Sequence, residues 1–141
     1  MAEPFHYSFF VTDLDAARAF YGDLLGCAEG RSAETWVDFD FFGNQISAHL
    51  TGQMPGTRNT GQVDGIAVPM PHFGAIVAWD AFHALADRVR AAGVEFVVDP
   101  RVRFEGQAGE QATMFFVDPS GNALEFKSFR RPEEVFAPHD R

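Results

Sequence analysis

Residues 5–26 read FHYSFFVTDLDAARAFYGDLLG, which is typical of a strand followed by a helix. Aromatic and β-branched residues fill positions 5–11 and predict the strand, and Asp13 is suited to cap the N-terminus of the helix. Gly26 tolerates the positive φ that commonly ends a helix. Between these two residues, apolar side chains recur at helical spacing, at Leu14, Ala17, Phe20, Tyr21, Leu24 and Leu25. We therefore expect a strand and a helix with one apolar face.

The rest of the first half predicts a pair of strands. Residues 36–41 and 45–50 are rich in apolar and aromatic side chains, and Gly43-Asn44 between them suits a tight turn. The first half therefore reads β-α-β-β.

The second half of the chain repeats this order. We expect a strand from about residue 72 to residue 78, then a helix from its N-cap Asp80 to Gly93. The strands that follow are expected at 94–98, 113–117 and 123–129, the last two flanking a turn that contains Pro and Gly. This half therefore reads β-α-β-β-β.

The internal repeat predicts the fold, because a half-sheet with helices on one face has an open edge and an uncovered opposite face. Side by side, two such modules make an α+β fold with a curved, mixed, mostly antiparallel sheet around a cavity and with helices on the convex face. We place module one at about 4–51 and module two at about 72–129. Residues 52–71 are rich in Gly and Pro and lack a period, so they are a linker or a lid, and 130–141 form a polar tail.

Composition narrows the class of protein. A chain of 141 residues that is 46% hydrophobic and 22% charged is long enough for one compact domain. The net charge of −9 argues against nucleic acid as a partner. No targeting segment or membrane-spanning apolar run is apparent, and the single cysteine, Cys27, suits a reducing compartment, so we expect a cytoplasmic protein without a membrane partner. Cys27 is interpreted as a buried packing residue.

Four residues with metal-ligating side chains have symmetric positions in the two modules. His6 lies in the first strand of module one, and His72 opens the first strand of module two. His49 and Glu125 lie in the last strands of the two modules and are approximately equivalent. In strands, residues an even number apart share a face, and His6, His49 and Glu125 each fall on the less apolar face. This pattern predicts a metal ion in the cavity.

Two imidazoles and one carboxylate leave open positions on a divalent ion. Such a ligand set suits non-haem Fe(II), which we favour, and it also accommodates Mn, Zn or Ni.

Two stretches resemble the vicinal-oxygen-chelate superfamily, which includes glyoxalases, bleomycin resistance proteins and extradiol dioxygenases. Residues 11–26 are similar to its first helix, and residues 118–126, DPSGNALEF, are similar to its final hairpin with the metal-binding glutamate. The resemblance covers residues 4–129, and the whole chain is most like small bacterial proteins described as predicted extradiol-type dioxygenases.

This resemblance implies the chemistry of the site. His6, His72 and Glu125 match the two-histidine, one-glutamate ligands of the metal-dependent members, and His49 is a fourth ligand or a catalytic base. The substrate is then a small molecule with vicinal oxygens, and the protein is expected to be a homodimer.

Three functional classes stay open. An extradiol-type dioxygenase would use His49 as the base, but its larger relatives also use a tyrosine, and here Tyr7 faces away while Tyr21 lies on the core face of a helix. A glyoxalase-like isomerase or lyase has a glutamate as fourth ligand where this chain is expected to have His49, which leaves Glu125 as the sole carboxylate base. The third class is a binding protein that sequesters a small molecule without turnover.

Further residues are assigned with alternatives. Strand alternation puts either Met114 and Phe116 or Thr113 and Phe115 on the cavity side. Three arginines are interpreted as solvated loop charges, with contact to an anionic substrate as the alternative: Arg58, Arg101 and Arg103.

Overall fold

The computed structural model describes residues 3–55 and 59–138, and these form two compact units. The first unit contains the described residues up to 55 together with the turn 118–122, and the second contains the others. Each unit has its own four-stranded, mixed and mostly antiparallel sheet, which confirms the α+β class. No helix among the described residues is long and apolar enough to cross a bilayer.

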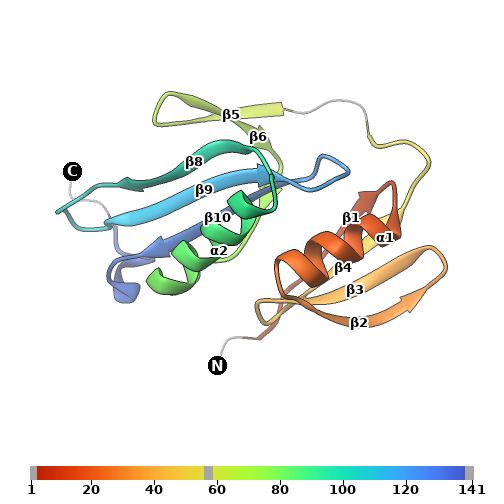
Figure 1. Cartoon of the computed structure of the whole chain (residues 1–141). Helices are drawn as coiled ribbons and strands as arrows, with labels where there is room; N and C mark the ends of the chain where they lie inside the picture. Colours follow the sequence, from red (N-terminus) through yellow and green to blue (C-terminus); the bar gives the residue numbers. More distant parts are fainter. Residues whose placement is uncertain (1–2, 56–58, 139–141) are drawn as a thin grey trace. The chain divides into compact units, whose positions relative to one another are not determined.

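The first unit is a βαβββ module, with one strand more than the sequence indicated. The extra strand is β2, whose residues are all exposed, so it lacks the apolar alternation by which a strand is found. In the sheet order β1-β4-β3-β2, β1 and β4 are parallel and the other pairs are antiparallel. The elements in Figure 1 are β1 (His6–Val11), α1 (Leu14–Ala17), the π-helical turn η1 (Arg18–Leu24), β2 (Ala28–Ala33), β3 (Trp36–Phe41) and β4 (Asn44–Leu50).

The helical segment of the first unit follows its sequence signals. The Asp13 side chain accepts a hydrogen bond from the Ala16 amide at 3.0 Å, which is the predicted N-cap. Gly26 follows the segment with a φ of 78°. The buried face carries Ala17, Phe20, Tyr21 and Leu25. The predicted apolar face is therefore the one that packs on the sheet.

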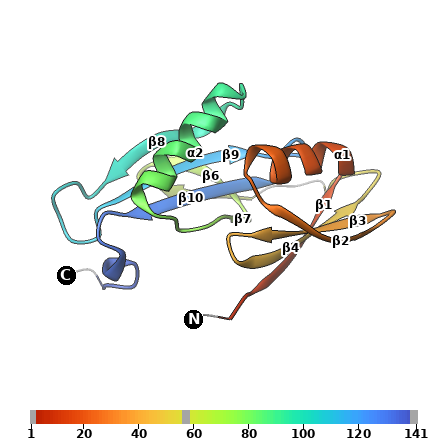
Figure 2. The ribbon, with the colours of Figure 1, turned by 60° about the horizontal axis from the view of Figure 1, so that its bottom comes forward.

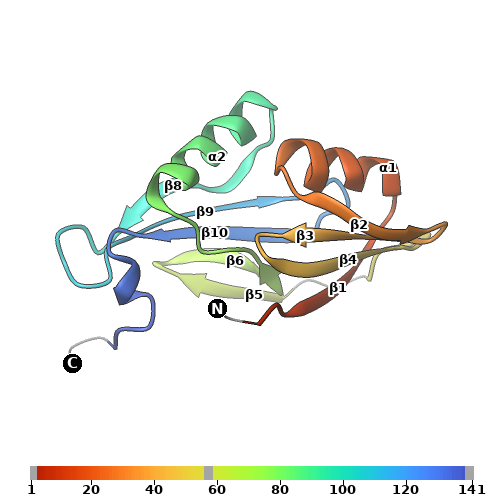
Figure 3. The same cartoon turned by 90° about the horizontal axis from the view of Figure 1, so that it is seen from below.

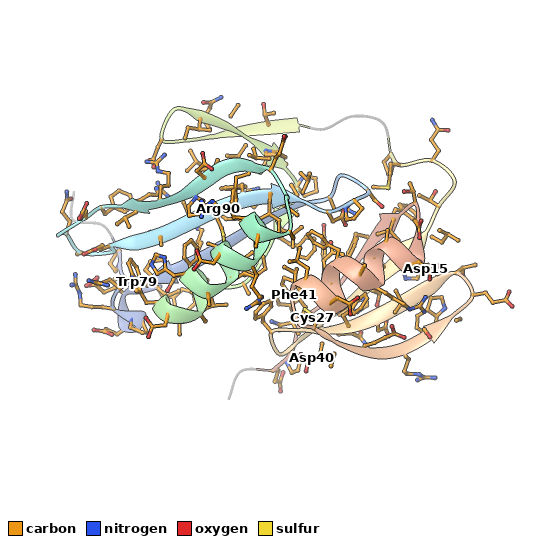
Figure 4. The ribbon with its side chains drawn as sticks, viewed as in Figure 1. Asp15, Cys27, Asp40, Phe41, Trp79 and Arg90 are labelled. Atoms are coloured by element: carbon orange, nitrogen blue, oxygen red, sulfur yellow. The ribbon has the colours of Figure 1, made fainter. Side chains whose placement is uncertain are left out.

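Cys27 lies just beyond this helical segment and is 7% exposed, as its interpretation as a packing residue requires. Figure 4 shows it close to Asp40 and Phe41. Burial, and then the negative charge of Asp40, raise the pKa of the Cys27 thiol to about 12.

We expect Cys27 to react very slowly with a disulfide reagent in the folded protein. At about pH 8, a thiol with this pKa has a thiolate fraction roughly three orders of magnitude below that of a free cysteine. Labelling with an aromatic disulfide, followed by absorbance, measures the rate, and the same protein in guanidinium chloride is the control. Fast labelling of the folded chain would contradict the buried position.

The second unit holds the remaining elements. They are β5 (Asn59–Val63), β6 (Ile66–Met70), β7 (His72–Phe73), α2 (Trp79–Ala91), β8 (Phe96–Arg103), β9 (Gln111–Val117), β10 (Ala123–Phe129) and the 3-10 turn η2 (Pro132–Glu134). The sheet order is β7-β10-β9-β8, with β7 parallel to β10 and the others antiparallel. Within this unit, Figures 2 and 3 show α2 on one side of the sheet and the β5–β6 hairpin on the other. Helix α2 buries Phe82, Leu85, Ala86 and Val89, and it starts after Ala78 without the predicted cap from Asp80.

The β5–β6 hairpin lies in the segment that the sequence predicted to be a loop. Its turn, Asp64-Gly65, has positive φ at both residues, 52° and 77°, as a two-residue hairpin turn requires. Gly61 and Pro69 interrupt the two strands and hide their alternation. The hairpin packs Val68 into a core cluster of the second unit.

Two of the three arginines assigned to loops lie in strand β8 and hold this hairpin. Arg103 donates two hydrogen bonds to the Asp64 carboxylate, at 2.6 and 3.0 Å, and Arg101 donates one at 3.0 Å. These contacts lower the pKa of Asp64, and the hydrogen bonding of Arg103 has the largest effect. Arg58 lies outside the described residues.

The strand predicted at 72–78 is interrupted at Gly74. Strand β7 ends at Phe73, and the chain then continues beside β10, where Lys127 exchanges backbone hydrogen bonds with Ala75 and Val77. A Cβ atom at Gly74 would lie 1.5 Å from the carbonyl oxygen of Glu125. Only glycine fits at this crossing of two backbones.

Candidate metal site

Two of the predicted ligands meet in the second unit. His72 pairs with Ala123 across β7 and β10, and Glu125 follows on the same face, two residues along. The His72 Nε2 atom lies 3.2 Å from Glu125 Oε1. Glu125 is only 9% exposed, so its carboxylate is held away from bulk water. The structure therefore brings His72 and Glu125 together from strands that are distant in the sequence.

Hydrogen bonds fix the orientation of both side chains. The Thr113 hydroxyl donates to Glu125 Oε2 at 2.5 Å, which leaves Oε1 directed at His72. On the other side of the imidazole, Nδ1 lies 2.8 Å from the carbonyl oxygen of Pro69. Because a carbonyl only accepts, Nδ1 carries a proton, and Nε2 is the ring nitrogen that faces Glu125 Oε1.

The chemistry of this pair calls for a cation. Two electron-pair donors 3.2 Å apart repel each other unless a proton or a metal ion lies between them. Adjacent donor atoms on a six-coordinate ion, each about 2.1 Å from it, are separated by about 3 Å. The separation of His72 Nε2 and Glu125 Oε1 therefore fits a shared divalent ion.

The structure shows which face of strand β9 lies next to the His72–Glu125 pair. Thr113 bonds to Glu125, and the Phe115 ring packs edge-on against the His72 imidazole with centroids 4.9 Å apart. Thr113 and Phe115 therefore lie on the ligand side, and the alternating Met114 and Phe116 lie on the other.

His6 has a comparable arrangement in the first unit, where its side chain is exposed. Gln45 Nε2 faces the carboxylate of Asp38 at 3.4 Å, which directs Gln45 Oε1 at His6 Nδ1, 2.7 Å away. Nδ1 is therefore again the protonated nitrogen. His6 Nε2 accepts from the Ser8 hydroxyl at 2.9 Å, so a single hydroxyl has to turn away to free this lone pair.

His49 lies further along the same sheet. It pairs with Phe10 on β1 and Trp36 on β3, and its ring centroid is 6.5 Å from that of Trp36. His49 is four positions along β4 from Gln45, the strand partner of His6, which is ~13 Å of strand. Ser8, Phe10 and His49 line a surface pocket of about 350 Å³.

The register corrects the equivalence of His49 and Glu125. Glu125 stands two residues beyond the strand partner of His72, and Ser47 stands two residues beyond the strand partner of His6. Ser47 is therefore the counterpart of Glu125, and its hydroxyl donates to Asp38 at 2.5 Å.

Within residues 3–55 and 59–138, no three His, Cys, Asp or Glu side chains gather into a ready metal-binding group. Of the four predicted ligands, His72 and Glu125 lie in the second unit, and His6 and His49 lie in the first. The sequence did not reveal the residues that orient these ligands, because a backbone carbonyl such as that of Pro69 has no side-chain signature. Thr113 had a detectable signal, since it is a polar residue among the apolar side chains in the middle of β9.

Comparisons with known proteins agree with this fold. The family model described as Glyoxalase/Bleomycin resistance protein/Dioxygenase superfamily matches residues 4–126. A glyoxalase/bleomycin resistance protein/dioxygenase from Alicyclobacillus acidocaldarius is 30% identical with a TM-score of 0.74, covering 95% of this chain and 96% of that one. The fosfomycin resistance protein FosX from Listeria monocytogenes is 21% identical with a TM-score of 0.70, covering 95% and 98%. The search of curated sequences gave no match.

Proposed function

Since the chain belongs to the glyoxalase/bleomycin resistance protein/dioxygenase superfamily, we propose that it is a metal-dependent enzyme for a small molecule with vicinal oxygens. The observation that carries the proposal is the facing pair of donors, His72 Nε2 and Glu125 Oε1, 3.2 Å apart.

The proposed ligands of one divalent ion are His6, His72 and Glu125. In both histidines a hydrogen-bond acceptor holds the proton on Nδ1 and leaves Nε2 as the ligand atom. Two imidazoles and one carboxylate are the ligand set of non-haem Fe(II) oxygenases, so iron is the favoured metal, with Mn, Zn and Ni as alternatives.

The proposed reaction is extradiol-type dioxygenation. The ion, when bound, would hold two vicinal oxygens and O2 together and pass electrons between them. Thr113 keeps the Glu125 carboxylate oriented, and the Phe115 ring shields His72 from water. His49 is proposed as the base that takes the second phenolic proton on a ring nitrogen, because it shares a pocket with Ser8, the hydrogen-bond partner of His6.

The residue at the fourth ligand position favours this reaction over a glyoxalase-like isomerase or lyase. Glyoxalase I binds its metal there through a glutamate, and the residue proposed for that position in this chain is Ser47, which stands two residues beyond the strand partner of His6. Its hydroxyl is already bonded to Asp38, so Glu125 is the one carboxylate that the proposed ligand set contains.

We expect protein purified without a polyhistidine tag to carry about one divalent ion per chain, because the donors are oriented before the ion arrives. His6→Ala, His72→Ala and Glu125→Ala should each lose most of the metal in plasma mass spectrometry. His83→Ala is the matched control, since His83 lies exposed on α2. Equal metal in wild type and His6→Ala would remove the proposed site.

His49→Ala separates the two roles of this histidine. As a base, His49 is dispensable for metal content but needed for turnover, and as a ligand it is needed for both. Oxygen uptake with catechols by the iron form supports the dioxygenase. Anaerobic isomerisation with nickel or zinc supports the glyoxalase-like alternative, and retention of a ligand without product supports a binding protein.

We also propose a homodimer, as is usual for relatives of this length. Mixing His6→Ala with Glu125→Ala tests whether two subunits share ligands. A shared site leaves one intact ligand set in each mixed dimer and restores metal binding, whereas ligands from one chain restore none.

A further inference from the structure

The sheet face that carries Glu125 continues toward a second feature of the same unit. Side chains on this face form successive rows across β10, β9 and β8. The first row contains Glu125 and Phe115, the second Lys127, Thr113 and Arg101, and the third Phe129, Gln111 and Arg103. The third row is four residues along β10 from the first, which is a distance of ~13 Å. The face therefore runs continuously from the proposed metal ligand to the third row.

A cavity of about 490 Å³ lies at the third row. Its apolar wall includes Phe104, Phe129 and Val135, and its polar lining includes Lys127 and Gln111. This volume lies in the range of small-molecule sites, and much of the lining is charged or amide side chains, namely Arg103, Gln107, Gln111, Lys127 and Glu134.

Gln111 lines the cavity and has a buried acceptor that no donor among the described residues satisfies. The side chain is only 8% exposed, and its Nε2 donates to the Gly109 carbonyl at 3.2 Å. This bond fixes the amide orientation, and Oε1 is buried with no donor among the residues that the structure describes. An orphaned buried acceptor is costly, and an N–H or O–H group of a ligand would satisfy it.

The charge of the cavity favours an anion. Arg103 is engaged by Asp64, and the Glu134 carboxylate accepts from Arg131 and from the Gly109 amide. Lys127 has a weaker ion pair than these residues, since its Nζ lies 4.0 Å from Glu125 Oε2 and its side chain is 35% exposed. Its ammonium group stands between the proposed metal ligand and the cavity.

We propose that this cavity binds the distal part of the substrate, and that the substrate class is an elongated organic acid with an apolar body. Lys127 pairs with its negative group, and Gln111 Oε1 accepts from its N–H or O–H group. The assignment of the bound molecule as substrate rests on the proposed function, whereas the binding itself does not require a metal.

The first test uses metal-free protein and the fluorescent probe toluidinyl naphthalene sulfonate, an elongated apolar anion with one N–H. Lys127→Met should weaken its binding about tenfold, and the uncharged N-phenylnaphthylamine should be unaffected. Gln111→Leu should weaken both probes, because both carry an N–H. The matched control is Arg90→Met. It removes a cation of α2 that lies over the Phe96 ring and not in the cavity (Figure 4).

The second test uses the wild-type chain and so does not depend on the folding of a variant. Lys127 is the only lysine of the sequence, so reductive methylation with isotope-labelled formaldehyde gives a single side-chain resonance besides the N-terminus. Titration with the sulfonate should shift this resonance. An unshifted resonance, or equal sulfonate affinity in Lys127→Met and wild type, would overturn the proposal. Because both tests omit metal, a failed metal site leaves their outcome intact.

Discussion

Gly74→Ala is expected to damage the His72–Glu125 pair more than any other single methyl group added to the second unit. The new Cβ would lie 1.5 Å from the Glu125 carbonyl oxygen and 2.5 Å from its carbonyl carbon, and neither belongs to a flexible side chain that can turn away. The backbone of β7 or β10 must move, at a cost of about 3 kcal/mol or more in the free energy of unfolding. Urea denaturation measures this cost.

Metal content gives a second measurement on the same variant. A shift of β10 moves Glu125 relative to His72, so Gly74→Ala should bind metal more weakly even where it remains folded. Gly52→Ala is the matched control, since a Cβ there meets nothing within 4 Å. A Gly74→Ala protein with wild-type stability would show that the two backbones do not approach so closely.

Asp118→Ala is expected to have a comparable effect on the first unit. This carboxylate is 3% exposed and accepts from the Tyr21 hydroxyl at 2.7 Å, from the Ser120 and Asn122 amides at 2.9 and 2.8 Å, and from the Asn122 side chain at 2.9 Å. Its removal leaves the fully buried Tyr21 hydroxyl without an acceptor and unties the turn, so unfolding should become easier by about 3 kcal/mol or more.

Tyr21→Phe isolates one of these bonds and should cost about 1.5–3 kcal/mol, the range for a hydrogen bond to a charged group. Burial, followed by the charge of Asp118, raises the pKa of Tyr21 well above its ordinary value. The unfolded chain then ionises this tyrosine first, and stability falls as pH rises above about 10. Unfolding curves of wild type should show this fall more strongly than those of Tyr21→Phe, and equal slopes would contradict it.

The fold could be predicted wherever one face of an element is apolar. The helix after Asp13 was predicted because its buried side chains recur at helical spacing, and the turn at 118–122 because of its proline and glycine. Strand β2 carries no such signal, since it is exposed throughout. The β5–β6 hairpin did carry one, the Asp64-Gly65 pair, but Gly61 and Pro69 obscured the strands on either side.

The candidate site could be predicted in its ligand types and less well in its geometry. Parallel pairing of first and last strands brings His72 close to Glu125, as the repeat indicated. The match of His49 with Glu125 was wrong, because strand ends are a poor guide to register and a shift of two residues keeps the same face. Hydrogen-bonded pairing assigns that place to Ser47, which side-chain chemistry alone would not have selected.

The carbonyl group that holds the proton on His72 belongs to Pro69, and Pro69 is part of the β5–β6 hairpin. A hairpin that swung outward would take this acceptor with it, and the imidazole would then be free to rotate or to exchange its tautomer. The hydrogen bonds of Arg101 and Arg103 to Asp64 tie the hairpin to β8, so they help to keep the Pro69 carbonyl in place and the His72 ring in its present orientation.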